Sequence, residues 1–71
     1  MNRSKGTYLQ GVLDAEQLAK DSLGFDESKV IRILENSLTS LEIYYDGYDY
    51  IEGFRHYIEY FKTYLELIKE N

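Results

Sequence analysis

The 71-residue sequence predicts a small all-α domain of three helices, with the last two packed as an antiparallel pair. Apolar residues in the middle and C-terminal segments recur at alternating spacings of three and four, the pattern of a helix with one buried face. Proline is absent, and glycines together with capping residues divide the chain into segments of helical length. A chain of this size forms one domain, here residues 1–71.

The first third of the chain carries the weakest helical pattern. Its apolar residues fit a helix that is broken or kinked near Gly11. Alternatively, Asp14 and Gln17 form a capping box that begins a shorter helix. Gly24 is placed to end the helix, because glycine readily adopts the C-terminal capping geometry. Both interpretations predict a helix over residues 15–23.

A second helix is predicted from Glu27 to about Tyr45. Asp26 is a natural N-cap, since its carboxylate can accept from a backbone N–H of the first turn. The helix presents one apolar face, made of Val30, Ile33, Leu34, Leu38, Leu41 and Tyr45.

The Asp46-Gly47 pair that follows has two interpretations. In the first, the glycine adopts left-handed geometry that ends the second helix, and the chain turns into a third helix. In the second, the pair is the tight turn of a β-hairpin between residues 43–45 and 48–50, which would give an α+β fold. Helical periodicity reaches the pair from both sides and favours the helical turn.

The third helix has the clearest pattern and is predicted over residues 50–69. Asp49 and Glu52 fit a capping box in which Asp49 is the N-cap. The apolar seam consists of Ile51, Phe54, Ile58, Phe61, Leu65 and Ile68. A row of tyrosines, Tyr50, Tyr57 and Tyr64, borders this seam and either widens the core or forms a protein interface.

The charges are distributed unevenly along the chain. Residues 14–49 contain nine acids against three bases, whereas each glutamate at 52, 59 and 66 precedes a base by three residues. Such neighbours meet on a helix surface, so the third helix neutralises itself. Glu35, Glu42 and Asp46 are then expected to form an acidic strip with no base to balance it, beside Tyr44 or Tyr48.

The composition argues against an enzyme, a metal site or a cofactor. The sequence has no cysteine and one histidine, His56, which removes thiolate sites and most zinc sites. It has no nucleophile elbow, calcium loop or glycine-rich phosphate loop. We therefore expect no catalytic residue, no metal ligand and no cofactor-binding residue, with His56 at the surface.

Net charge limits the classes of partner. A charge of −5 and a pI near 4.7 argue against nucleic acid and anionic membranes, because both are polyanions, and permit a basic protein. No apolar run approaches the ~18 residues that span a bilayer. Arg3 and Lys5 are followed by no apolar core of a signal peptide, so we expect a cytoplasmic protein.

In size, acidity and lack of catalytic residues, the whole chain resembles the small early proteins with which bacteriophages disable host machinery. More narrowly, it resembles a phage DNA mimic of the kind that blocks the bacterial histone-like protein HU. The resemblance implies an inhibitor, acting in the host cytoplasm, whose negative surface occupies a basic DNA-binding groove. Fixed carboxylates can replace phosphates in such a groove and steer association.

The residues expected to bind the partner are the acids of the first two helices and the residues of the turn. They are Asp14, Glu16, Asp21, Glu27, Glu35, Glu42, Tyr44, Asp46, Tyr48 and Asp49. The alternative function is a small adaptor or structural domain that associates through the tyrosine-lined third helix. A homodimer or another partner would then cover tyrosines that three helices have little room to bury.

Overall fold

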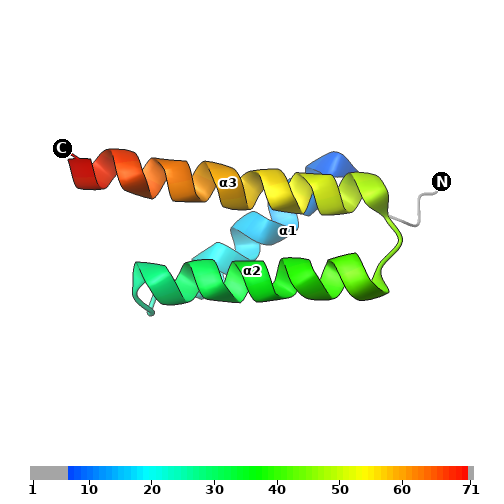
Figure 1. The fold of residues 1–71 in the computed structure, drawn as a ribbon, viewed down its shortest axis with the longest axis horizontal. Helices are drawn as coiled ribbons and strands as arrows, with labels where there is room; N and C mark the ends of the chain where they lie inside the picture. Colours follow the sequence, from blue (N-terminus) through cyan, green and yellow to red (C-terminus); the bar gives the residue numbers. More distant parts are fainter. Residues whose placement is uncertain (1–6, 71) are drawn as a thin grey trace.

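The computed structural model describes residues 7–70, which form three α-helices and no strand. They are α1 (Tyr8–Asp21), α2 (Glu27–Tyr44) and α3 (Tyr48–Glu70). In Figure 1, α2 and α3 lie side by side and run in opposite directions, while α1 crosses the pair diagonally. The predicted all-α class is confirmed. The hairpin alternative is wrong, because residues 45–47 form the irregular connection between two helices.

The first helix is longer than predicted. Thr7 is its N-cap, and the Thr7 hydroxyl oxygen accepts from the Gln10 backbone N–H at 3.1 Å. The helix runs unbroken through Gly11, and Asp14 lies within it, so both the break and the Asp14-Gln17 capping box are wrong. It ends at Asp21 rather than at Leu23. Arg3 and Lys5, which bear on the signal-peptide prediction, lie outside the described residues.

The boundaries of the other helices are close to those predicted. Asp26 caps α2 as expected, with its carboxylate accepting from the Lys29 backbone N–H at 2.9 Å. Helix α2 ends one residue early, where Tyr45 takes an extended backbone. Helix α3 begins two residues early, and the Gly47 carbonyl accepts its first helical bond. Asp49 is therefore a first-turn residue and not the N-cap, where it still interacts favourably with the helix dipole.

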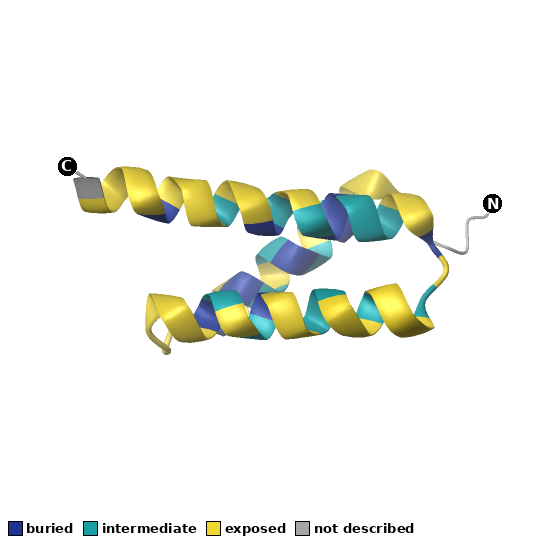
Figure 2. Cartoon of the chain, viewed as in Figure 1, coloured by how far each residue is buried: buried dark blue, intermediate teal, exposed yellow. Residues whose placement is uncertain are grey.

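The core lies where the three helices face one another, as the buried positions in Figure 2 show. Helix α1 contributes only small residues to it, whereas α2 and α3 contribute larger apolar side chains. The central cluster consists of Ala15, Ala19, Val30, Leu34, Phe54 and Ile58. Of the predicted seam of α3, Ile68 is half exposed, so the core does not extend to the end of that helix.

Helices α1 and α3 cross at two glycines, Gly11 and Gly53. A Cβ atom added to Gly11 would lie 2.1 Å from the Tyr50 carbonyl oxygen, and one added to Gly53 would lie 2.0 Å from the Tyr8 carbonyl oxygen. The two backbones are therefore in direct contact, and neither position has room for a side chain. This close crossing places the Tyr50 side chain against α1.

Candidate functional site

The acidic strip predicted along α2 lies opposite the basic row of α3. Three ion pairs join the helices: Glu42 with Arg55 at 2.6 Å, Glu35 with Lys62 at 2.7 Å, and Glu27 with Lys69 at 3.4 Å. As the residue number rises along α2, that of the partner falls along α3. The expectation that Glu35 and Glu42 have no base to balance them is therefore wrong.

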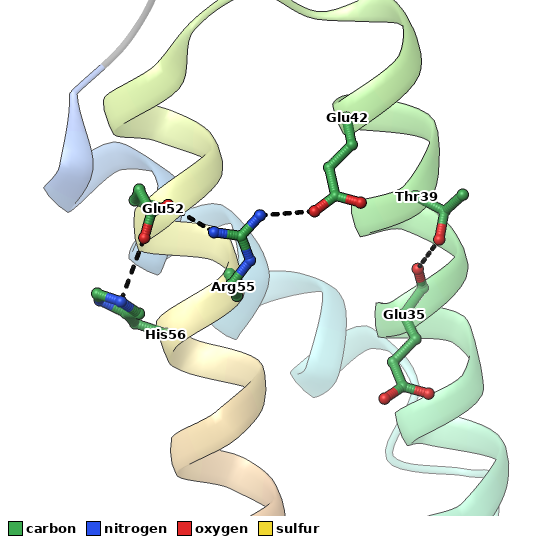
Figure 3. Close-up of polar contacts among 6 residues, drawn as sticks. All are labelled: Glu35, Thr39, Glu42, Glu52, Arg55 and His56. Carbon is green, nitrogen blue, oxygen red and sulfur yellow. Dashed lines mark hydrogen bonds and ion pairs between the residues drawn. The ribbon is translucent and has the colours of Figure 1, made fainter.

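Arg55 stands at the centre of the most connected part of this row (Figure 3). Its guanidinium donates to Glu42 of α2 at 2.6 Å and to Glu52 of α3 at 2.5 Å. The hydrogen bond with Glu42 is the main reason that the pKa of Arg55 is raised. All these side chains keep contact with solvent, so each pair contributes on the order of 1 kcal/mol or less.

His56 has two partners: Glu52, one turn away on the same helix, and Tyr8, which its place in the sequence did not indicate. Its Nε2 atom lies 3.3 Å from Glu52, and its Nδ1 atom lies 2.7 Å from the Tyr8 hydroxyl. The Tyr8 ring also packs edge-on to the imidazole. These contacts join the first residue of α1 to α3 beside the glycine crossing. We therefore assign His56 to holding α1 in place.

Six of the predicted partner-binding residues gather at the end of the molecule where α2 turns into α3. Tyr44 and Tyr48 flank the connection and are 85% and 72% exposed. The Tyr45 ring meets the Tyr50 ring edge-on at 5.2 Å, and the Tyr50 hydroxyl donates to Asp14, which brings α1 to the same end. We call this set the turn surface: Asp14, Glu42, Tyr44, Asp46, Tyr48 and Asp49.

The other four predicted residues lie outside the turn surface. Glu16 pairs with Lys20 at 3.9 Å on α1, and Asp21 accepts from the Gln17 side chain at 2.9 Å. Glu27 and Glu35 belong to the ion pairs with α3 described above. These four carboxylates add to the overall negative charge, and each has a partner within the chain.

A pocket of about 460 Å³ opens between the three helices beside the turn surface. Two serines of α2 also border it, but its walls are mainly aromatic and aliphatic: Leu18, Leu41, Tyr44, Tyr45, Tyr50 and Phe54. We call it the turn pocket. Asp14 is not one of the lining residues, but its carboxylate accepts from the hydroxyl of Tyr50, which lines the pocket. Sequence reasoning missed the pocket because it depends on how α1 crosses the other two helices.

Burial of Tyr50, assisted by its hydrogen bond to Asp14, raises the pKa of its phenol, and burial likewise raises that of Tyr57. The folded protein thus keeps these protons at pH values where the unfolded chain, with tyrosine pKa of about 10, releases them. Unfolding then releases protons at these pH values. The stability that the two protonated phenols contribute is therefore fully present below pH ~10 and is lost as the pH rises above that value.

We expect Tyr50→Phe to lower the free energy of unfolding by about 1 kcal/mol at neutral pH, through loss of the bond to Asp14. The same variant should lose stability less steeply above pH ~10, because one of the two protected phenols is gone. Urea unfolding across this pH range measures both effects. Tyr44→Phe, at an exposed position, is the control. An unchanged alkaline slope in Tyr50→Phe would contradict this account.

Within residues 7–70, no group of three or more histidine, aspartate or glutamate side chains is placed to hold a metal ion. In the same range, no helix is both long and apolar enough to cross a membrane. Comparison with known proteins found no match to a family model, to a curated protein or to a solved structure.

Proposed function

We propose that this chain is a non-enzymatic inhibitor that binds a basic, nucleic-acid-binding host protein through the turn surface. The observation that carries the proposal is the meeting of exposed tyrosines and carboxylates at one end of the molecule. Tyr44 and Tyr48 are the two most exposed tyrosines of the described chain, and Asp46 and Asp49 lie beside them. Tyrosine is enriched among the residues that anchor protein interfaces.

Charge supports a basic partner. The net charge of −5 attracts a basic surface over a distance of about one Debye length, ~8 Å at physiological salt. A DNA-binding groove lined with lysine and arginine, as in a histone-like protein such as HU, is the class of surface that this charge fits. The chain would occupy the groove in place of DNA, as a DNA mimic does.

The ion pairs between α2 and α3 engage some of the carboxylates that would bind the partner, but they do not prevent that binding. Glu35 and Glu42 are occupied by Lys62 and Arg55 in the free protein. Because exposed pairs of this kind are worth little, the bases of a partner can replace Lys62 and Arg55 at small cost. The turn surface makes the first contact, and the acids of α2 extend it.

Binding to purified HU, measured by calorimetry at low and high salt, tests the proposal. We expect binding at low salt that weakens as salt rises. The double variant Asp46→Asn/Asp49→Asn should weaken binding by about tenfold, which corresponds to ~1.4 kcal/mol. The matched control Glu59→Gln/Glu66→Gln removes two charges from α3 outside the turn surface and should have a smaller effect.

Three outcomes would count against the proposal. An equal loss in both double variants would mean that only net charge matters, and absence of binding to HU would remove this partner class. Binding that ignores salt and is lost in Tyr64→Ala would favour the adaptor function. That alternative has its own observation, since Tyr60 and Tyr64 are exposed on α3 with their rings stacked at 6.4 Å.

A further inference from the structure

The turn pocket has the composition of a site for a cation with a flat or aliphatic body. Its aromatic walls come from α2, α3 and the connection between them, and the Tyr45 and Tyr50 rings meet at 61° as adjacent walls. None of the residues that line it is basic. Cations bind favourably to tyrosine ring faces, and the attraction grows when the site excludes water.

Asp14 supplies a carboxylate that is hydrogen-bonded to Tyr50, one of the residues that line this pocket. It is half buried, and its two oxygens accept from the Tyr50 hydroxyl and, at 2.8 Å, from the Gln10 side chain. An ionised carboxylate has about four lone-pair sites, so each oxygen retains capacity for a further donor. The Tyr50 hydroxyl and the Gln10 amide hold the carboxylate in one orientation beside the aromatic walls.

We propose that the turn pocket receives the side chain of an arginine from the basic partner, with the guanidinium between the tyrosine rings and the Asp14 carboxylate. This inference rests on the proposed function for the source of the arginine. A guanidinium is planar, weakly hydrated and rich in donors, and it stacks on aromatic rings while bonding a carboxylate. A lysine ammonium is more strongly hydrated, and an apolar side chain would leave the carboxylate unused.

Chemical-shift titration of the labelled full chain with blocked tripeptides tests the inference. The probes are glycine–arginine–glycine and its neutral isostere glycine–citrulline–glycine. We expect the arginine peptide to move the signals of Tyr44, Tyr45 and Tyr50 and to bind about tenfold more tightly than the citrulline peptide, a difference of ~1.4 kcal/mol.

Two carboxylates on α1 provide a matched pair of variants. Asp14 and Asp21 each accept from a glutamine side chain four residues earlier, but only Asp14 also accepts from a residue that lines the pocket. Asp14→Asn should reduce the affinity for the arginine peptide about tenfold, to the citrulline level, whereas Asp21→Asn should leave it unchanged. If Asp14→Asn does not fold, Ser40→Phe provides a second test. Its ring fills the pocket from the α2 wall, so it should abolish the signal shifts that the arginine peptide causes.

Equal binding of the arginine and citrulline peptides would overturn the inference. Preferred binding of a glycine–phenylalanine–glycine peptide would also overturn it, because the pocket would then accept an apolar anchor. The result is separable from the proposed function. Arginine binding without HU binding would remove the partner class alone, and HU binding that leaves the pocket signals unmoved would remove the arginine site alone.

Discussion

Replacing Gly53 with alanine will destabilise the protein by about 3 kcal/mol or more, although alanine is the better helix former. The added Cβ would lie 2.0 Å from the Tyr8 carbonyl oxygen of α1. That oxygen belongs to the backbone, so it cannot move aside as a side chain can. The helices must separate, and separation exposes the apolar residues between them. Gly11→Ala should act in the same way through the Tyr50 carbonyl.

Urea unfolding followed by circular dichroism measures this effect, and Gly24→Ala is its control. A Cβ on Gly24 meets no atom within 4 Å, so that variant should change stability by less than about 1 kcal/mol. The opposing influence is helix propensity, which favours alanine over glycine by about 1 kcal/mol inside a helix. A Gly53→Ala protein that gains stability would show that propensity, and not the crossing, governs this position.

These glycines also show where sequence reasoning stops. The spacing of Val30, Leu34, Phe54 and Ile58 predicted two helices and most of their buried faces, because burial follows directly from periodicity. A single glycine within a helical pattern is ambiguous, since it can mark a break or a close approach. One of the two interpretations of the first segment placed a break or kink near Gly11. Only the position of α3 across α1 shows that it is a contact.

The start of α1 was left open between two interpretations for a related reason. Asp14 was considered as the start of a shorter helix, whereas the structure places the N-cap at Thr7. The outcome depends on whether the first turn, with Tyr8, gains a partner. It gains one in His56 and in the crossing at Gly53, so the helix begins at Tyr8 with Thr7 as its N-cap.

The acidic strip was predicted from the charges of neighbouring residues along the chain. In the structure, acids of α2 are instead balanced by bases of α3. Glu35 and Glu42 recur at a spacing of seven, as do Arg55 and Lys62. In helices that run in opposite directions these rows face each other, and combining the predicted pairing with this spacing would have shown it. The turn pocket was not predictable in this way, because it needs the angle at which α1 crosses.

Leu34→Ala is expected to be the most damaging truncation among the apolar side chains of α2. Leu34 is the largest fully buried side chain in the described part of the chain, at 0% exposure, and it lies in the cluster that joins all three helices. Removing its buried methyl groups should lower the free energy of unfolding by about 3 kcal/mol, from lost burial and from the cavity left behind. In a domain of this size the melting temperature should fall by roughly 10–20 °C.

Thermal and urea unfolding of Leu34→Ala tests this expectation, with Ile68→Ala as the control. Ile68 belongs to the predicted seam of α3 but is 48% exposed. Ile68→Ala should cost about 1 kcal/mol or less. Similar losses in the two variants would mean that the three helices do not share one packed core at Leu34. Because Leu34 is not part of the turn surface, the folded fraction of Leu34→Ala should bind HU with unchanged affinity at low temperature. Core damage and loss of the interaction surface are thereby separated by experiment.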